Sequence, residues 1–348
     1  MYGHNETLRP IKLQSSLHET IWGGDHLAAV AGKDLAPGSR VGESWETEVG
    51  NVAVNPPYAG RTLASLAESM GDDLLGTQAI AVFGRRFPLL AKFIDASDRL
   101  SVQVHPDDVY AREHADGSLG KTEAWYILRA DPGARLVLGL DHQSSADEVR
   151  RAIDDSRLEA LLHEFPVRVG DVVFVPAGMV HAIGAGVVLF ELQEYSDITY
   201  RLYDYGRVQA NGRPRELHVD RGLAVMRYGA ADRDTVRPVD VATGAEPARR
   251  RVLVACRYFV LEEIALTGTT VSATTATSCS IVTTLAGHAE IAQPDGQDPV
   301  RLALGQTAVL PARMGPYTLT GHKLRLLHSY VPTDDDALAR RWSAAQGA

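Results

Sequence analysis

The sequence contains little cysteine. Only two cysteines, Cys256 and Cys279, occur in 348 residues. Two thiols cannot supply the several disulfides that hold small secreted domains together, so the sequence excludes a disulfide framework. We expect both side chains to be plain buried thiols, which fits a chain that works in the cytoplasm.

The sequence also lacks an excess of positive charge and a long apolar run. It has 35 lysines and arginines against 44 acidic residues, which gives a formal net charge of -9. No apolar run approaches the ~20 residues of a membrane-spanning helix, and the first residues, MYGHNETLRPIKLQ, do not have the pattern of a signal peptide. We therefore expect a protein that binds neither nucleic acid nor membrane, and that is a monomer or a weak homo-oligomer.

The length and apolar content favour two domains. Hydrophobic residues make up 45% of the chain, which is enough for sizeable cores, and 348 residues suit two fused β-modules better than one domain. We predict a mainly β protein built from two cupin-like β-barrel or jelly-roll modules with helical insertions. The proposed division is a catalytic, metal-binding module over residues 1–235 and a degenerate, metal-free module over residues 236–348.

The most informative stretch is GDVVFVPAGMVH, from Gly170 to His181. It fits the pattern G-x5-P-x-G-x2-H, in which Gly170 permits a tight turn and an apolar β-like run follows. Pro176 and Gly178 then end the strand and bend the backbone. The pattern indicates that His181 points into a barrel as a metal ligand; the alternative is a buried histidine satisfied by a backbone partner.

Further candidate ligands lie upstream in SVQVH. Side chains alternate along a strand, so Ser101, Gln103 and His105 share one face, while Val102 and Val104 occupy the other. Polar side chains on the inner face of a barrel are costly to bury unless they have partners, and a bound ion with its substrate would provide them.

The segment GKTEAWYIL adds a carboxylate to this set. His105, Glu123 and His181 together offer two imidazoles and a carboxylate, which suits a zinc-like ion with open coordination positions. Gln103 is a candidate fourth ligand through its amide oxygen. Glu123 has an alternative interpretation, in which it only pairs with Lys121 on the same strand face.

A third polar segment follows His181. In it Glu191 lies on a strand with alternating polar residues, and Arg201 follows among Tyr200, Tyr203 and Tyr205. An arginine among tyrosines can be a stacked structural residue, but the neighbouring candidate metal site favours a functional role.

These residues carry a family resemblance. The chain closely resembles the short bacterial form of the type I mannose-6-phosphate isomerases, strongly over residues 8–207 and weakly beyond. The matching segments are IWGG, GESWE, FPLLAKFIDASDRLSVQVHPDD, GKTEAWYIL, VPAGMVHAI and EYSDITYRLYDYGR. The asparagine that ends the general cupin pattern is absent after His181.

The resemblance implies one zinc ion per chain and specific residues around it. The ligands would be His105, Glu123 and His181, with Gln103 the less uniform fourth, and Arg201 would be the active-site arginine. The positions that match the substrate-contacting residues of the family are Ser101, Lys121 and Glu191.

The implied activity is an aldose-ketose isomerase that interconverts mannose 6-phosphate and fructose 6-phosphate through a metal-stabilised enediolate. Arg201 would add positive charge beside the enediolate. Glu191 is the candidate general base, and Lys121 or a metal-bound water are alternatives that the sequence leaves open. The rival functions are a sugar-binding cupin without turnover and an iron-dependent cupin oxygenase, which also uses two histidines and a carboxylate.

Patterns elsewhere predict the remaining organisation. We expect a helical stretch over 62–83, a loop over 106–120, a hairpin over 122–140 around Asp131-Pro132-Gly133, and a helical insertion over 144–165. A second series of strands spans 252–331 and repeats the G-x5-P signature from Gly305 to Pro311, but without a following histidine. His288 and Glu290 would form at most an incomplete site there, so we expect no metal in the second module.

Overall fold

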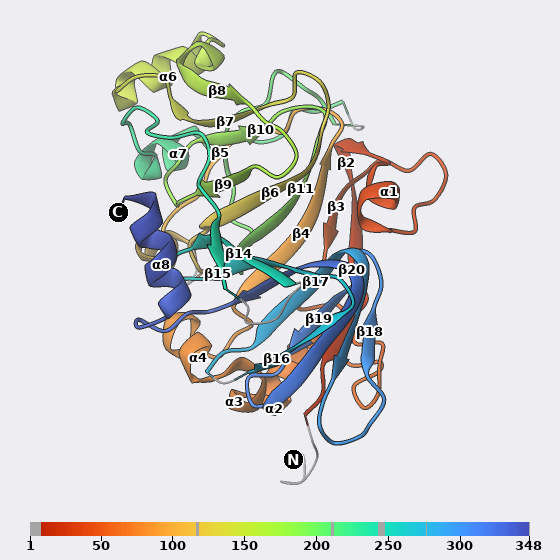
Figure 1. The fold of residues 1–348 in the computed structure, drawn as a ribbon. Coiled ribbons are helices and arrows are strands. Elements are labelled where there is room, and N and C mark those ends of the chain that lie inside the picture. Colours follow the sequence, from red (N-terminus) through yellow and green to blue (C-terminus); the bar gives the residue numbers. More distant parts are fainter. Residues whose placement is uncertain (1–7, 116–117, 210–211, 243–247, 276, 348) are drawn as a thin grey trace.

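The computed structural model of the chain describes residues 8–115, 118–209, 212–242, 248–275 and 277–347. Three antiparallel sheets dominate these residues, with helices at the edges (Figure 1). This arrangement confirms the prediction of a mainly β, cupin-like protein. Within the described part of the chain, no helix is long and apolar enough to cross a membrane.

Two of the sheets form the N-terminal module, which is the proposed catalytic module. The first has the strand order β2 (Ser16–Gly24), β3 (Val41–Trp45), β4 (Leu89–Ala96), β11 (Val187–Glu194), β6 (Glu123–Ala130) and β9 (Val172–Val175). The second has the order β12 (Tyr200–Tyr203), β5 (Val102–Val104), β10 (His181–Ile183), β7 (Arg135–Leu140) and β8 (Leu162–Pro166). Side chains of both, such as Trp125, Leu138 and Leu189, belong to one buried apolar cluster.

The third sheet forms the C-terminal module. Its main order is β1 (Ile11–Leu13), β19 (Thr307–Leu310), β17 (Ser280–Ala292), β20 (Pro316–Tyr330), β15 (Val260–Leu266), β14 (Ala248–Ala255) and β13 (Val239–Val241). Strand β16 (Thr269–Thr274) pairs with β20, and β18 (Val300–Leu302) pairs with β17. Ile11 of β1 lies opposite Val309, so an N-terminal strand joins this sheet. We retain the division near residue 235 as a proposal. Strand β1 is an exception to it, because β1 belongs to the first module by sequence but pairs with β19 of the C-terminal sheet.

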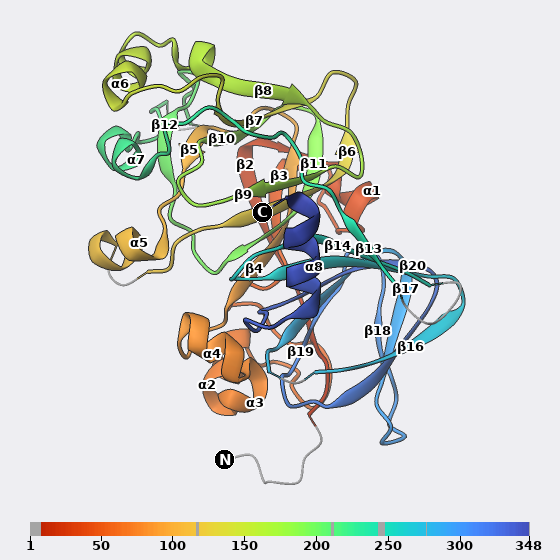
Figure 2. The ribbon, with the colours of Figure 1, turned by 60° about the vertical axis from the view of Figure 1, so that its left-hand side comes forward.

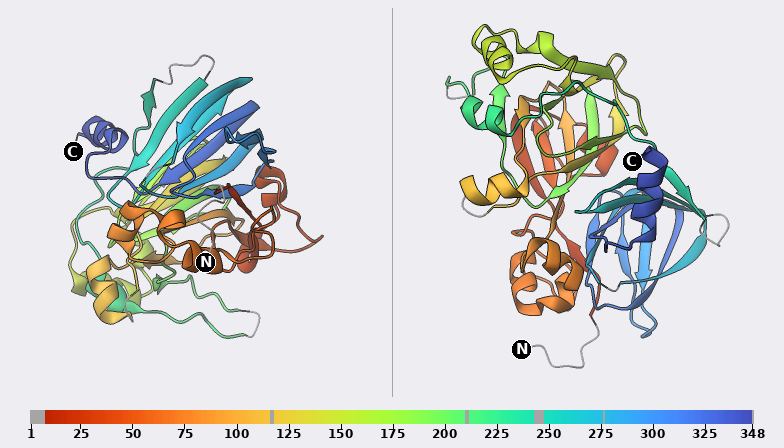
Figure 3. Two further views of the ribbon diagram at one scale, coloured as in Figure 1. Left: turned by 90° about the horizontal axis from the view of Figure 1, so that it is seen from below. Right: turned by 90° about the vertical axis from the view of Figure 1, so that its left-hand side faces the viewer.

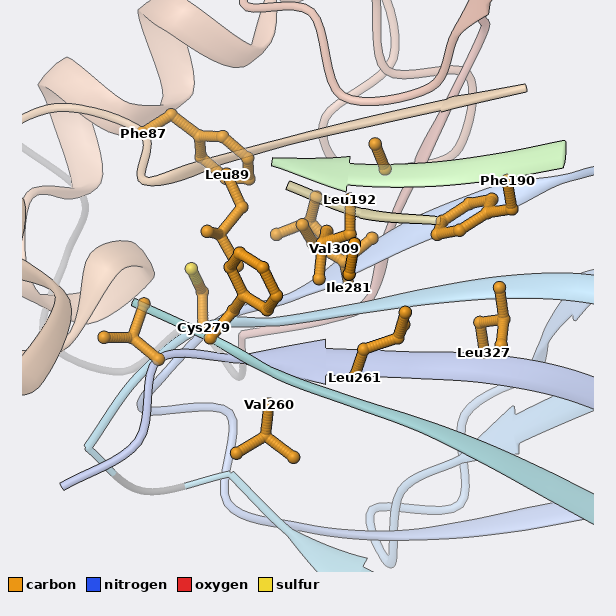
Figure 4. Close-up of a cluster of buried hydrophobic side chains, with 14 of the residues drawn as sticks. Phe87, Leu89, Phe190, Leu192, Val260, Leu261, Cys279, Ile281, Val309 and Leu327 are labelled. Carbon is orange, nitrogen blue, oxygen red and sulfur yellow. The ribbon is translucent and has the colours of Figure 1, made fainter. Parts of the chain in front are cut away.

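The two modules share a large apolar core. Every residue of β4 and β11 is buried, because one face of the six-stranded sheet lines the catalytic barrel and the other packs on the C-terminal module. Figure 4 shows Phe190 and Leu192 near Ile281, Leu261 and Leu327. A fully buried side chain of this size contributes about 1.5–3 kcal/mol, so this contact holds the catalytic sheet firmly.

The helical stretch predicted over 62–83 is present as three short helices. These are α2 (Leu63–Met70), α3 (Asp72–Leu75) and α4 (Thr77–Phe83), and they lie beside the C-terminal module in Figure 2. Gly71 and Gly76 separate them with φ angles of 50° and 85°. A Cβ atom on Gly76 would lie 2.3 Å from the carbonyl oxygen of Thr277, so only glycine fits this junction.

Two of the predicted connections are wrong. Residues 108–114 form a helix, α5 (Asp108–His114), because the side chain of Asp107 accepts a hydrogen bond from the backbone of Tyr110 and caps its first turn. The hairpin predicted over 122–140 does not form. Strands β6 and β7 are joined by a turn, but they pair with different neighbours in different sheets.

The predicted insertion over 144–165 is only partly helical. Ser145 caps α6 (Ala146–Asp154), a 3-10 turn covers Leu158–Leu161, and the remainder is strand β8. Figure 3 shows this insertion at the edge of the catalytic module, away from the C-terminal sheet. The remaining helices are α1 (Leu27–Ala31), α7 (Val219–Val225) and α8 (Ala337–Gln346).

Candidate active site

A polar cavity of about 900 Å³ opens between the two sheets of the catalytic module. Its walls come from β2, β3, β4 and β11 on one side and from β5 and β12 on the other. Most of the sequence-predicted residues line it or lie beside it, and they are considered in turn below.

The three predicted metal ligands converge. His105 follows β5, Glu123 begins β6, and His181 begins β10, yet one ligand atom from each lies within 4.8 Å of the others. Nε2 of His105 is 3.3 Å from Oε1 of Glu123, and Nε2 of His181 is 3.6 Å from Oε2. Each of the three residues is only 1% exposed. Among the residues that the structure describes, this is the one group of three or more acidic, histidine or cysteine side chains with such spacing.

Backbone partners fix both imidazoles in the orientation that a metal requires. Nδ1 of His105 is 2.7 Å from the carbonyl oxygen of Ile198, and Nδ1 of His181 is 2.8 Å from that of Met179. A carbonyl accepts hydrogen bonds only, so Nδ1 is the protonated nitrogen of each ring and Nε2 keeps its lone pair. Nε2 of His105 therefore has a free lone pair beside Glu123, and Nε2 of His181 also lies beside Glu123 but is 3.3 Å from Nε2 of Gln103.

Three of these ligand atoms have no hydrogen-bond partner of their own. Nε2 of His105 and both carboxylate oxygens of Glu123 are buried without a hydrogen-bond donor or acceptor. Burial, followed by the charge of Lys121, lowers the pKa of His105 to about 3, so its imidazole is neutral. Buried polar atoms without partners are costly, and a divalent cation would satisfy all of them. The donor set fits a metal ion.

The predicted turn pattern explains how the ligands are brought together. Gly170 has a φ of 93° and Gly178 a φ of 83°, which both favour glycine. The backbone N–H of Gly178 donates to the carbonyl oxygen of His105 over 2.8 Å. A Cβ on Gly178 would lie 2.9 Å from the carbonyl oxygen of Val225. The turn that leads to His181 is thus tied directly to the backbone of another ligand.

Gln103 lies at the edge of this group. It pairs in register with both His181 and Arg201, and its Nε2 is 3.3 Å from Nε2 of His181. A half turn about the last side-chain bond of Gln103 exchanges the positions of its amide nitrogen and oxygen, and the oxygen would then face an ion. Its role as a fourth ligand stays a prediction.

Lys121 is paired with Glu123, as the alternative interpretation of that carboxylate requires. Its Nζ is 2.8 Å from Oε1 of Glu123, although not in the direction of a hydrogen bond. Burial lowers the pKa of Lys121, but the charges of Glu123 and Glu191 outweigh burial and raise it overall. The ammonium group therefore keeps its proton, and it lines the cavity beside the candidate ligands.

Glu191 is buried in the cavity wall. Its Oε2 accepts a hydrogen bond from Nε1 of Trp125 over 2.9 Å, and its Oε1 lies 3.8 Å from Nζ of Lys92. Burial, followed by the negative charge of Glu123, raises the pKa of Glu191 to about 7. A carboxyl group with a pKa near neutrality can accept and return a proton.

Arg201 and Ser101 lie on neighbouring strands at the opposite wall. Nε of Arg201 donates to Oγ of Ser101 over 3.3 Å, and Nη1 donates to the carbonyl oxygen of Glu216 over 2.8 Å. Both residues line the cavity. Within the described residues no carboxylate lies in ion-pair contact with Arg201, so its charge is available to a ligand.

Sequence reasoning missed several cavity residues. Lys92 is 3% exposed, lies over the ring of Trp45 at 4.3 Å and is 3.5 Å from Glu43. Arg40 and Arg215 also line the cavity. A signal was available for Lys92, since a lone charge on the inner face of the apolar strand β4 requires a partner.

Two facing sheets that enclose a buried pair of histidines and a carboxylate define a cupin with a metal-ligand set. Comparison with known proteins then gives the family. The model of the type I phosphomannose isomerase catalytic domain matches residues 11–123, and that of the mannose-6-phosphate isomerase cupin domain matches residues 250–331. The chain belongs to the type I mannose-6-phosphate isomerases.

Relatives align over nearly the whole chain. Mannose-6-phosphate isomerase of Streptococcus mutans is 37% identical over 317 residues, which are 90% of this chain and 95% of that protein. Mannose-6-phosphate isomerase ManA of Bacillus subtilis is 34% identical over 321 residues, 91% of this chain and 97% of that one. The crystal structure of the Bacillus subtilis mannose 6-phosphate isomerase matches with a TM-score of 0.82 and 31% identity, covering 92% of this chain and 99% of that one.

Proposed function

We propose that the protein interconverts mannose 6-phosphate and fructose 6-phosphate. The observation that carries the proposal is the convergence of His105, Glu123 and His181 beside a polar cavity that Glu191 and Arg201 line. The names of its relatives, which align over about nine tenths of the chain, support mannose 6-phosphate as a substrate.

We propose zinc as the metal. Two neutral imidazoles and one carboxylate form the usual protein ligand set of a catalytic zinc ion, which keeps positions open for substrate. His105, Glu123 and His181 would hold the ion, with Gln103 as a candidate fourth ligand. When bound, zinc supplies Lewis-acid polarisation of the sugar carbonyl.

Glu191 is the proposed general base. Isomerisation removes a proton from the carbon beside the carbonyl and returns it to the neighbouring carbon, so one group must both accept and donate. The raised pKa of Glu191 suits both steps, and the hydrogen bond from Trp125 holds its carboxylate in place. Lys121 is less suited to removing the proton, because its raised pKa keeps it protonated.

Arg201 and Lys121 are the proposed stabilisers of negative charge. As the proton leaves, charge develops on the two oxygens of the enediolate, and fixed cations beside those oxygens lower the barrier. Ser101 holds Nε of Arg201 and orients its guanidinium toward the cavity. Lys121 contributes a second buried cation and a proposed contact to the sugar.

The decisive experiment is turnover of mannose 6-phosphate in an assay coupled to fructose 6-phosphate formation. We expect activity that is lost on chelation and restored by zinc. Binding of mannose 6-phosphate without turnover would favour a sugar-binding cupin. Substrate-dependent oxygen consumption restored by iron would favour a cupin oxygenase.

A further inference from the structure

Further arginines line the same cavity. Arg215, which belongs to the segment after β12, lines the cavity together with Arg201 and Arg40. Arg215 is more exposed than the residues around Glu123, with 19% of its side chain accessible. The position suits a group of the substrate that lies away from the reacting carbons.

Asp204 holds Arg215 in a fixed orientation. Nε of Arg215 donates to Oδ2 of Asp204 over 2.8 Å, and Nη2 donates to Oδ1 over 2.6 Å. Asp204 is 6% exposed and also accepts from Nη2 of Arg207 over 2.6 Å. Burial alone raises the pKa of Asp204, but the hydrogen bonds from Arg215 and Arg207 outweigh burial and lower it. The carboxylate is thus a charged anchor for two arginines.

This anchoring leaves part of the Arg215 guanidinium available. A guanidinium has five N–H groups, and the pair with Asp204 uses one on Nε and one on Nη2. The remaining donors belong to a planar group whose direction is already set, so a ligand that binds them loses little side-chain entropy. Planar, fixed donors are well suited to the oxygens of a phosphate.

Two other basic side chains that line the cavity are engaged by carboxylates, whereas among the described residues Arg201 and Arg40 have no carboxylate in ion-pair contact. Lys121 is 2.8 Å from Glu123, and Lys92 lies near both Glu43 and Glu191. Arg207 donates to the carbonyl oxygen of Arg99 and lies 3.4 Å from Asp98, and it does not line the cavity. Arg215 shares its one carboxylate with Arg207, so the negative charge of Asp204 is divided between two guanidiniums.

We propose that Arg215 binds the phosphate group of the sugar phosphate and that Asp204 is its positioning residue. The inference rests on the proposed function, because it assigns the phosphate end of that substrate. The reacting end of the sugar then lies toward His105 and Glu191, and the phosphate lies at the outer rim. Arg215 is accordingly a specificity-determining residue that selects phosphorylated over free sugar.

The test compares Arg215→Ala and Arg215→Lys with Arg213→Ala in the zinc-loaded enzyme. Arg213 is an exposed arginine two residues away that does not line the cavity, so it controls for a general change in charge. For Arg215→Ala we expect the KM for mannose 6-phosphate to rise roughly 30-fold, the size expected when a charge-assisted contact is lost. Competitive inhibition by inorganic phosphate should weaken by a similar factor. Arg215→Lys should recover part of the phosphate affinity, and Arg213→Ala should resemble the wild type.

A structural role for Arg215 predicts a different result. If the residue only supports the fold, Arg215→Ala would lower kcat or thermal stability and leave inhibition by phosphate unchanged, which would overturn the proposal. It would also be overturned if Arg40→Ala, and not Arg215→Ala, weakened phosphate inhibition.

Asp204→Asn should weaken phosphate inhibition less than Arg215→Ala does. If the wild-type enzyme does not turn over mannose 6-phosphate at all, the proposed function fails, whereas normal turnover with an unaffected Arg215→Ala variant rejects only this assignment.

Discussion

Both modules bury a glutamate beside a histidine, but they treat the pair differently. In the catalytic module, both oxygens of Glu123 and Nε2 of His105 lack hydrogen-bond partners. In the C-terminal module, Glu262 is 0% exposed and accepts hydrogen bonds from Arg250 over 2.5 and 2.9 Å and from Nδ1 of His328 over 2.6 Å. The two glutamates therefore differ in whether their carboxylate oxygens have hydrogen-bond partners, although Nε2 of His328, like Nε2 of His105, is buried without one.

The interiors of the two modules also differ, because the C-terminal module has an apolar interior where the catalytic module has a polar cavity. On the C-terminal side a buried cluster that includes Leu266, Val282 and Leu326 fills the space inside the sheet. His288 is exposed and Glu290 pairs with Arg301 over 2.7 Å on the surface, so the two residues considered from sequence do not face this interior. These contacts support the prediction of a metal-free supporting module, which still requires metal analysis.

The largest expected effect comes from breaking the unsatisfied pair. His181→Ala should lose both the bound metal and all measurable isomerase activity, because one of three ligands is removed. His328→Ala changes the histidine beside the hydrogen-bonded carboxylate of Glu262 and should keep about one metal per chain with near wild-type activity. Metal analysis together with the coupled assay checks both variants.

Two results would contradict this contrast. Metal retained at full stoichiometry in His181→Ala would reject the ligand set. A second metal per chain that disappears in His328→Ala or His288→Ala would show that the C-terminal module also binds an ion.

Glu191 provides the next largest effect. Replacing the proposed base by Glu191→Gln should lower kcat by roughly a thousandfold while the metal stays bound. The raised pKa of Glu191, about 7, predicts that wild-type activity falls as the pH drops below neutrality and the carboxylate becomes protonated. The kcat/KM profile should lose this acidic limb in Glu191→Gln. An unchanged profile in the variant would assign the limb to another group.

Arg201 should have a smaller effect on the same step. Arg201→Ala is expected to lower kcat by about a hundredfold with the metal retained, and Arg201→Lys should recover little because the planar donors are lost. Steady-state kinetics separates the alternatives, since a raised KM with normal kcat would make Arg201 a binding residue only.

The sequence predicted the residues of the site better than their environment. The spacing and alternation around His105, Glu123 and His181 were sufficient to select three side chains that converge in the fold, because turn glycines and strand faces are local properties. Lys92 and Arg215 were missed, since their positions depend on pairing between distant strands and on Asp204. The predicted hairpin failed for the same reason. A turn at Asp131 is visible in the sequence, but whether the next strand pairs with β6 or crosses to the other sheet is decided by tertiary packing.

The smallest effect concerns the hydrogen-bonded carboxylate of Glu262 in the C-terminal module. Burial alone raises the pKa of Glu262, but the hydrogen bonds from His328 and Arg250 outweigh it and lower the pKa to about 2. A carboxylate with a lowered folded-state pKa stabilises the fold above its unfolded pKa of about 4.5 and loses that contribution as the pH falls toward 2. The linkage amounts to at most roughly 3 kcal/mol.

Glu262→Gln should therefore lower the urea midpoint at pH 7, and the difference from wild type should shrink between pH 4.5 and pH 2 as the wild type loses its ionised carboxylate. Glu290→Gln is the matched control, because Glu290 also pairs with an arginine but 36% of its side chain is exposed. Exposed pairs contribute about 0–1 kcal/mol, so the control should change the midpoint little at any pH. If the two variants shift the midpoint equally at pH 7, burial does not strengthen the Glu262 pair. The contrast between the fully hydrogen-bonded carboxylate of Glu262 and the unpartnered carboxylate of Glu123 would then need another physical basis.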